Sequence, residues 1–239
     1  MSYVDLHTHI LPGLDDGSPD LATSMLMIDG LRTLGFSTIC ATPHQKTGQY
    51  LPTLEAISQA HQEVLAAVRE RSWSLKIPLA AENMWDETLY GRMQADTIPG
   101  YDGNRVFLME FVPSQLPVGL FERIFELRCN GILPVVAHPE RYSPLWDAPQ
   151  LVEKLASDCA MVVDLAAVAG DFGRKQAKVS RKMILDGIAH AAASDLHCLA
   201  DLKSAKKGIA WIRKKAGEAT LTRLLATNPA KILEGQHPG

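Results

Sequence analysis

Residues 3–9 read Tyr3-Val4-Asp5-Leu6-His7-Thr8-His9, in which a short strand-like run leads directly into two histidines. Six later runs are also short and apolar enough to predict buried strands, and they are Thr38–Thr42, Ile77–Ala81, Arg105–Met109, Leu133–Ala137, Met161–Leu165 and Ala189–Ala193. Polar residues follow most of these runs, as they follow the first. The opening stretch therefore sets a pattern: a buried strand with polar side chains at its carboxyl end.

Longer stretches with one apolar face separate the predicted strands and indicate helices. They span Leu21–Leu34, residues 54–71, Glu87–Gln94, Leu120–Cys129, Gln150–Ala156, Gly173–Leu185, Lys203–Ala216 and Ala219–Leu225. Ser18 is expected to cap the first helix, with Pro19 at the first helical position. Alternation of strands and helices predicts an α/β fold with a mainly parallel sheet. We expect a closed or nearly closed barrel of seven β/α units, with a doubly wound open sheet as the alternative.

The composition excludes several classes of function. The 239 residues carry 24 Lys and Arg against 27 Asp and Glu, and a net charge of −3 disfavours a nucleic-acid-binding protein. Hydrophobic residues make up 46% of the chain, which is enough for a full core. The first residues lack the basic and apolar regions of a signal peptide, and no run is long enough to span a membrane. The four cysteines are dispersed and suggest no disulfide framework, so we expect a cytoplasmic protein with no direct membrane insertion.

Eight side chains share one position in this pattern, at or just after the carboxyl end of a predicted strand. They are His7, His9, His44, Glu82, Glu110, His138, Asp195 and His197. The carboxyl ends of parallel barrel strands meet at one rim, so we expect these side chains to converge there. The sixth predicted strand contains Asp164 and lacks a comparable ending. Of the remaining histidines, His61 is expected on a helix surface, His190 inside a strand and His237 in a loose tail.

The residue types at these positions indicate a metal centre. Imidazole and carboxylate ligands without thiolate suit manganese, iron, zinc or cobalt better than they suit a structural zinc ion. His7 and His9 lie two residues apart on an extended segment, so they point the same way and can bind one ion together. Eight ligands exceed what one tetrahedral ion with an open position requires, and they suit two or three ions with a bridging carboxylate. Three divalent ions against three carboxylates would leave the site positive and attractive to a phosphate dianion.

Four stretches carry a resemblance to a known family. They are residues 5–13 with Asp15-Asp16-Gly17, Ala41-Thr42-Pro43-His44, Ala137-His138-Pro139-Glu140-Arg141-Tyr142 and Ala193-Ser194-Asp195-Leu196-His197. With them the chain resembles the PHP (polymerase and histidinol phosphatase) superfamily of metal-dependent phosphoesterases. Within that superfamily it looks most like the bacterial manganese-dependent protein-tyrosine phosphatases of capsular and exopolysaccharide operons.

The resemblance covers nearly the whole chain and implies one PHP-type metallophosphatase domain over residues 1–239, with a loose tail from about residue 235. It implies a distorted seven-stranded β/α barrel that holds three divalent metal ions. Manganese is the ion expected first, with iron, zinc or cobalt as alternatives. All eight residues given above match the ligand positions of the family.

The resemblance also implies hydrolysis of phosphotyrosine on a protein, with the tail of a membrane-bound tyrosine kinase as the partner. Arg141 matches an arginine that the family places over the phosphate. Asp15 and Asp16 are candidate proton donors to the leaving group, with turn formation before the first helix as their alternative role. Asp5 is expected to orient a ligand histidine.

Some positions depart from the family pattern. No arginine follows His197 until Arg213, and Gln45 and Asn83 stand where the family has other residues. Two rival functions therefore stay open: a small-metabolite phosphatase of the histidinol-phosphate type, and a catalytically weak metal-binding regulator. The sequence also leaves a homo-oligomer open.

Overall fold

The computed structural model describes residues 2–239, and Met1 lies outside the described residues. Eight strands are formed: β1 (Tyr3–Thr8), β2 (Phe36–Ala41), β3 (His44–Gln45), β4 (Glu82–Met84), β5 (Val106–Glu110), β6 (Leu133–Ala137), β7 (Ala160–Asp164) and β8 (Ala191–Ala193). The α-helices in the first half are α1 (Leu21–Thr33), α2 (Leu54–Glu70), α3 (Glu87–Ala95) and α4 (Leu120–Cys129). Those in the second half are α5 (Pro149–Asp158), α6 (Leu165–Ala169), α7 (Arg174–Leu185), α8 (Asp201–Lys215), α9 (Glu218–Thr222) and α10 (Asn228–Leu233).

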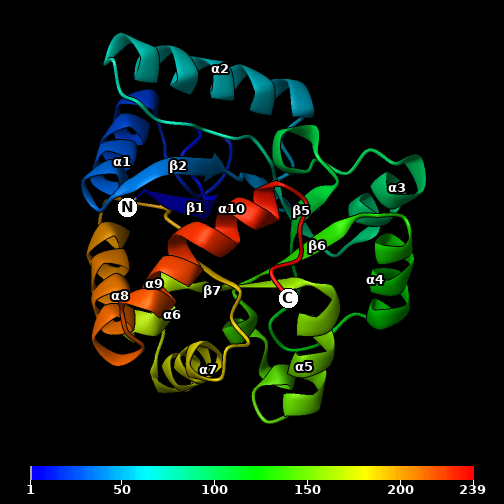
Figure 1. Cartoon of the computed structure of the whole chain (residues 1–239). Helices are drawn as coiled ribbons and strands as arrows, with labels where there is room; N and C mark the ends of the chain where they lie inside the picture. The colour runs from blue at the N-terminus through cyan, green and yellow to red at the C-terminus, as the bar shows by residue number, and fades with distance from the viewer. Residues whose placement is uncertain (1) are drawn as a thin grey trace.

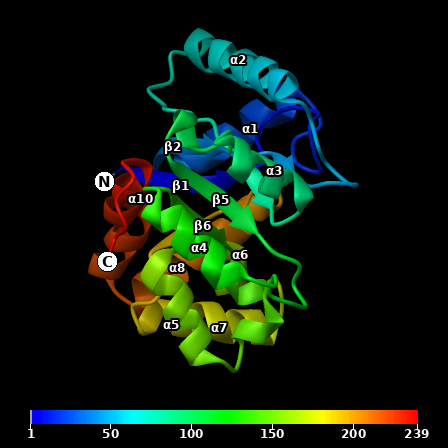
Figure 2. The same cartoon turned by 90° about the vertical axis from the view of Figure 1, so that its right-hand side faces the viewer.

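The strands form two parallel sheets, as the sequence predicts for an α/β protein. β1 pairs with β2, and β3 to β8 form a six-stranded sheet in sequence order. Single parallel bridges join Thr8 of β1 to Leu196 and Ala41 of β2 to Leu79, so the edges of the two sheets lie next to each other. Figures 1 and 2 show the strands at the centre, with α1 and α8, α5 and α7, and α3 and α4 on different sides of them.

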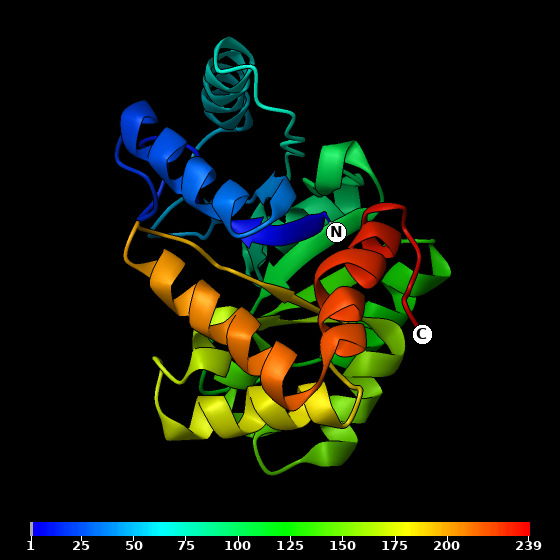
Figure 3. The same ribbon diagram turned by 60° about the vertical axis from the view of Figure 1, so that its left-hand side comes forward.

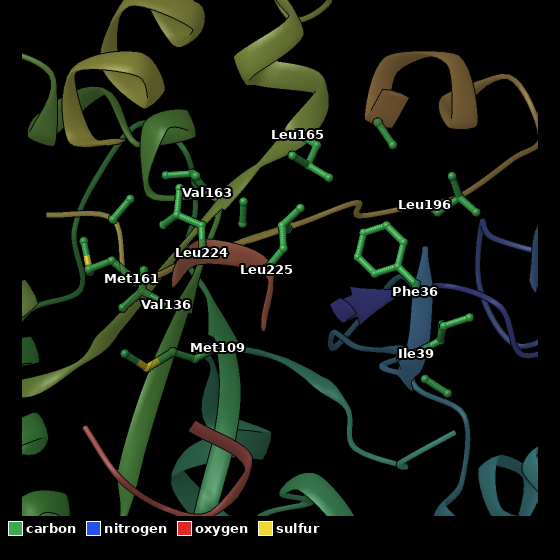
Figure 4. Close-up of a cluster of buried hydrophobic side chains, with 14 of the residues drawn as sticks. Phe36, Ile39, Met109, Val136, Met161, Val163, Leu165, Leu196, Leu224 and Leu225 are labelled. Atoms are coloured by element: carbon green, nitrogen blue, oxygen red, sulfur yellow. The ribbon is translucent and has the colours of Figure 1, made fainter. Parts of the chain in front are cut away.

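Strand residues alternate between two hydrophobic clusters. One cluster lies under the helices, and Figure 4 shows Met109, Val136, Met161 and Val163 from the strands in it, together with Leu165 and other residues. The next residues along the strands pack in a second cluster, and among them are Leu6, Cys40, Leu108, Val135, Ala137, Val162 and Ala193. Glu110 continues the inward alternation of Val106 and Leu108. The face that carries the second cluster therefore ends in a polar group.

The predicted third strand, Ile77–Ala81, is wrong in its position. Leu79 of that segment and the preceding Lys76 make only isolated bridges, and the next strand is β4. Pro78 explains the shift, because a proline has no N–H to donate to a strand ladder and here offers only its carbonyl, to the Ala41 amide. The two-residue strand β3 raises the number of strands among the described residues to eight, so the predicted count of seven is not confirmed.

Two local predictions near helices are also corrected. Asp20, not Ser18, caps α1, because the Asp20 carboxylate accepts a hydrogen bond of 2.7 Å from the Thr23 amide. His61 lies on the buried face of α2, where its Nε2 is 2.7 Å from the Ile77 carbonyl oxygen. The sequence placed His61 on the surface because α2 was expected to pack only through its aliphatic residues.

The end of the chain contacts the rest of the molecule. His237 was expected in a loose tail, and in the structure its Nε2 lies 3.1 Å from the Cys159 carbonyl oxygen. Its ring meets the ring of His190 edge to face, with 4.8 Å between centroids. All four cysteines are free. No helix in residues 2–239 is long and apolar enough to cross a membrane.

Candidate metal centre

The eight predicted ligand residues come together at the polar end of the strands. His7 lies in β1, Glu110 ends β5, and His138 directly follows β6. His44 and Glu82 are the first residues of β3 and β4, and the parallel pairing places them side by side in register. Six of the eight are buried, and His44 and His197 are partly exposed. The convergence expected from the strand pattern is therefore present.

Glu82 lies at the middle of the cluster. Its Oε2 is 2.8 Å from His44 Nδ1 and 3.3 Å from His7 Nε2. Its Oε1 is 2.9 Å from His138 Nε2. One fully buried carboxylate thus faces His7 of β1, His44 of β3 and His138, which directly follows β6. This is the arrangement expected of a ligand shared between neighbouring cations.

Asp195 makes a second focus. Its Oδ1 lies 3.3 Å from the Nε2 atoms of both His7 and His9, and those two nitrogens are 3.1 Å apart. Two imidazoles separated by one residue on the extended chain therefore aim at one point, as predicted from their spacing. The backbone of Asp195 is left-handed, with φ of 48°, and this bends the chain after β8 so that the carboxylate enters the cluster.

Four sets of side chains bring their ligand atoms within 4.8 Å of one another. The sets are His7, His9 and Asp195; His7, Glu82 and His138; His44, Glu82 and Glu110; and His9, Asp16, His44 and His197. His7, His9, His44 and Glu82 each belong to two sets. Asp16 was predicted as a proton donor and not as a ligand, and it lies 3.4 Å from His44 Nε2 and 3.6 Å from His197 Nε2.

Buried ligand atoms show that the residues fit a group of cations. His44 Nδ1, Glu82 Oε2, Glu110 Oε1 and Asp195 Oδ1 are buried and form no hydrogen bond of good geometry among the described residues, although each lies close to an oppositely charged group. Each of these atoms belongs to one of the four sets, and a divalent cation bound there would satisfy it. The nitrogen and oxygen donors are those preferred by manganese, iron, zinc and cobalt.

The protonation of the cluster points the same way. Burial favours neutral His9, but hydrogen bonds to Asp15 and Asp195 outweigh it and raise the pKa of His9 to about 10. Burial is likewise outweighed at His44, where Glu110 and Glu82 raise the pKa to about 11. These protons stand in for the positive charge that the carboxylates require. Cations would displace them, since a metal ligand must be deprotonated.

Three ligand histidines are oriented through the ring nitrogen that faces away from the cluster. His9 Nδ1 donates to Asp15 at 2.8 Å, and His197 Nδ1 donates to the Asp195 carbonyl oxygen at 2.9 Å. His138 Nδ1 lies 3.2 Å from the Tyr142 hydroxyl, which itself donates to the Ala137 carbonyl. Such contacts fix the ring and leave Nε2 free to bind a metal ion. They explain why Asp15 and Tyr142 belong to the characteristic motifs.

The Asp15-Asp16-Gly17 stretch forms a turn against His9. Asp15 accepts hydrogen bonds from the Gly17 amide at 3.0 Å and from the His44 amide at 2.9 Å. Burial would raise the pKa of Asp15, but His9 outweighs it and lowers the pKa to about 2. The Asp15 carboxylate is thus held as an acceptor within this turn, and a proton-donor role for the two aspartates stays a prediction.

Arg141 lies at the edge of the cluster and is held by two carboxylates. Its Nη2 donates to both Asp164 and Asp195. The face of the guanidinium lies 4.5 Å from the ring centroid of Phe172. Asp164 ends β7, so the sixth predicted strand also reaches the site, through Arg141 and not through a ligand. Burial would lower the pKa of Arg141, and the surrounding carboxylates outweigh it and raise the pKa.

Asp5 acts on the backbone and not on a histidine ring. Its Oδ1 accepts from the Ser194 amide at 3.0 Å and from the His7 amide at 3.3 Å. The side chain is fully buried, and burial raises its pKa to about 6. Asp5 therefore ties the end of β1 to the end of β8, which differs from the predicted orientation of a ligand ring.

Several contributors escaped the sequence patterns. The Tyr50 ring stacks on His44 with 5.8 Å between centroids, and Phe172 covers Arg141. Gln45 and Asn83, which depart from the family pattern, both accept hydrogen bonds from Arg92 beneath the site. Tyr50 and Phe172 lie outside the strands and Arg92 lies in α3, so no strand ending marked these three residues.

The fold and the cluster together define the class of protein: an α/β protein with parallel strands that carries a candidate metal centre at one end of its strands. Residues 3–234 match the family model described as capsular polysaccharide synthesis, CpsB/CapC. The chain belongs to this family, which confirms the resemblance predicted from the motifs.

Relatives and solved structures agree with that assignment. The chain is 27% identical over 238 residues to the tyrosine-protein phosphatase YwqE of Bacillus subtilis, covering 98% of this chain and 92% of the relative. It also superposes on a solved structure from work on B. subtilis YwqE and Streptococcus pneumoniae CpsB, which are described as metal-dependent tyrosine phosphatases. The TM-score is 0.88 and the identity 25%, over 99% of this chain and 95% of the other.

A more distant likeness concerns the fold alone. The histidinol phosphate phosphatase of Lactococcus lactis, solved with zinc, L-histidinol and phosphate, matches with a TM-score of 0.56 at 12% identity. The match covers 91% of this chain and 95% of the other.

Proposed function

We propose that this chain is a metal-dependent protein-tyrosine phosphatase that hydrolyses phosphotyrosine monoesters on proteins. The observation that carries the proposal is the set of buried imidazole and carboxylate groups that face one another at the end of the strands, with ligand atoms that form no hydrogen bond of good geometry. Membership of the CpsB/CapC family supports it, as do relatives named tyrosine-protein phosphatases and the metal-dependent tyrosine phosphatase structure. Their 25–27% identity spans nearly the whole chain.

The eight residues of the cluster would hold the metal ions. We assign His7, His9, His44, Glu82, Glu110, His138, Asp195 and His197 as ligands of three divalent cations, with manganese first and iron, zinc or cobalt as alternatives. The shared membership of Glu82 and three histidines in two sets supports more than one ion. When bound, the cations supply a water molecule of lowered pKa as nucleophile and neutralise charge on the phosphoryl oxygens.

Arg141 would pair with a phosphoryl oxygen and stabilise the charge that develops in the transition state. Asp164 and Asp195 hold its guanidinium in place before the substrate arrives, which limits reorganisation during the reaction. Asp16 is half exposed at the mouth of the cluster and is the candidate holder of the leaving-group proton. Asp15 orients His9 and supports catalysis from that position. Tyrosinate has a pKa near ~10 and leaves with little help, so Asp16 contributes less than Arg141.

The remaining finer assignments follow from the same site. We propose that the two sheets form one distorted barrel in a single domain over residues 1–239, in which the two-residue strand β3 adds to the seven predicted strands. The bridges between the sheets and the shared inner cluster support this. The physiological substrate proposed is a phosphotyrosine-bearing tail of a membrane-bound tyrosine kinase, in keeping with a capsule-synthesis family.

The test combines metal content and hydrolysis on one preparation. The chain loaded with manganese should bind about three ions and hydrolyse an aryl phosphate and a phosphotyrosine peptide faster than histidinol phosphate. His7→Ala and His138→Ala should lose metal and activity together, whereas His237→Ala, which lies outside the cluster, should keep both. A metal-loaded chain that hydrolyses no phosphate ester would refute the proposal in favour of a metal-binding regulator, and a preference for histidinol phosphate would favour a metabolite phosphatase.

A further inference from the structure

A groove on the outer wall of the molecule carries four cationic side chains in a lining that is otherwise largely apolar. It encloses about 630 Å³ between α7 and the end of α8. Figure 3 shows these two helices side by side. We call it the basic groove, and its charged lining consists of Arg174, Lys178, Arg181 and Lys182 against the single acid Asp186. A chain with a net charge of −3 therefore concentrates positive charge on this one face.

The basic groove begins at the edge of the metal centre. Gly170 and Gly173 line its near end, and Phe172 lies between them in the chain. The Phe172 ring covers the Arg141 guanidinium at 4.5 Å and is itself 45% exposed. A protein chain with a phosphate bound beside Arg141 would therefore meet the groove within a few residues of its phosphorylated side chain.

Two of the four cations form no side-chain hydrogen bond or ion pair with the described residues. Arg181 donates to the Val168 carbonyl and lies over Trp211, and Lys182 pairs with Asp186. Arg174 and Lys178 are exposed and make no side-chain hydrogen bond or ion pair with residues 2–239. Their positive charges are available to a ligand.

The arrangement of these charges is unfavourable for the helix itself. Arg174, Lys178 and Lys182 follow one another at intervals of four residues, and like charges at that spacing destabilise a helix. Arg174 and Lys175 also lie in the first turn, which contains no acid, although the helix dipole favours negative charge there. An anionic ligand bound along this face would relieve the repulsion between these positive charges.

We infer that the basic groove binds an acidic segment of the substrate protein that adjoins the phosphotyrosine, an inference that rests on the proposed function. The 12 residues of α7 extend about 18 Å, which matches about five residues of extended peptide. The substrate class is then a phosphotyrosine with several Asp or Glu residues close by in sequence. The groove contributes to substrate binding and takes no part in the chemical step.

The test compares phosphotyrosine peptides that carry an acidic run before the phosphotyrosine, an acidic run after it, or neutral residues on both sides. For the metal-loaded protein at low salt, KM for at least one acidic peptide should be about tenfold below that of the neutral peptide, with kcat unchanged. Arg174→Glu with Lys178→Glu should remove the difference. The matched control Arg69→Glu with Lys231→Glu makes the same charge change at exposed residues of α2 and α10 and should keep it. A small aryl phosphate should show the same kinetics in all three proteins.

Two results would overturn the inference. One is equal KM for acidic and neutral peptides in the unmodified protein. The other is a preference for acidic peptides that persists in the Arg174→Glu/Lys178→Glu variant. If that variant keeps the preference but loses binding to phosphatidylserine vesicles, the groove binds a lipid surface and not an acidic peptide. If no aryl phosphate were hydrolysed, the proposed function would fail, and fluorescence anisotropy of labelled acidic and neutral peptides on the same variants would still decide whether the groove binds acidic chains.

Discussion

Gly17 lies so close to His9 that a single methyl group should disturb the metal centre. A Cβ added at Gly17 would lie 2.2 Å from the His9 carbonyl oxygen and 2.4 Å from His9 Cβ. Ordinary contacts between such atoms exceed about 3.2 Å, so the turn or the histidine must move by about 1 Å. Both obstacles are close to the backbone of a fully buried residue, and neither can rotate away.

We expect Gly17→Ala to destabilise the protein by about 1–3 kcal/mol, the usual cost of overpacking. The larger effect concerns the site, because the same turn carries Asp15, which orients His9 and binds the His44 amide. A displacement of about 1 Å at catalytic groups lowers rates by about a hundredfold. Metal affinity should fall as well, since His9 loses its orienting partner.

The assay measures manganese affinity by calorimetry, aryl phosphate hydrolysis, and the urea midpoint. Gly91→Ala is the matched control, because no atom lies within 4 Å of a Cβ added there and Gly91 stands inside α3. That variant should keep full activity, and its free energy of unfolding should rise by about 0.5–1 kcal/mol, since alanine is the better helix former. If Gly17→Ala kept the metal affinity and the rate of the unmodified protein, the close approach would not position the ligands, and the role given to the turn would be refuted.

Three further perturbations test other contacts. Asp164→Asn keeps the N-cap of α6 but replaces a charged acceptor of Arg141 by a neutral one. We expect kcat/KM to fall about tenfold at unchanged metal content. An unchanged kcat/KM would contradict the positioning role of Asp164. Tyr142→Phe removes the hydroxyl beside His138. Calorimetry should then show a metal affinity about tenfold lower, and urea unfolding should show a free energy of unfolding lower by about 1–3 kcal/mol. An unaltered metal titration and urea midpoint would refute the orienting role of the hydroxyl. Burial lowers the pKa of His190 to about 4, below its ordinary 6.5, so the unfolded chain takes up the proton first and stability falls as pH drops through 6.5 towards 4. Between pH 7.5 and 5 this effect lowers the free energy of unfolding by about 2 kcal/mol. Urea unfolding of His190→Gln should therefore show a decrease over this pH range that is smaller by that amount than in the unmodified protein. An equal decrease in both proteins would rule the effect out.

The strand pattern predicted the convergence of the eight side chains because the geometry behind it is generic. Side chains such as His7 and Glu110 reach the cluster simply by standing at the ends of parallel strands, and period-two alternation decides the face on which they lie. The same reasoning could not place Asp5 on the Ser194 amide, because that bond depends on how two strands far apart in the chain meet. Pro78 displaced the third strand through a missing donor that a hydrophobicity pattern does not register.

Loop and helix contributors were beyond the reach of the sequence for a different reason. Phe172 covers Arg141 from a loop whose path depends on α6, a five-residue helix too short to show periodicity. Nothing in the sequence singled out the cations of α7, because the groove that they line depends on Trp211 of α8, which is far away in the chain. Burial of His61 depended on the neighbouring segment that carries Ile77, and one sequence offers no sign of that contact.

The join between the two ends of the chain has a consequence for how the protein acquires its site. Asp5 bonds to Ser194 across 189 positions of sequence, and the Asp195 amide donates to the His7 carbonyl at the same junction. Contacts of such long range form slowly and late, because they require the closure of nearly the entire polypeptide. A fragment that lacks either β1 or the segment after β8 lacks part of the cluster, so uptake of a cation during synthesis would report that these two segments have met.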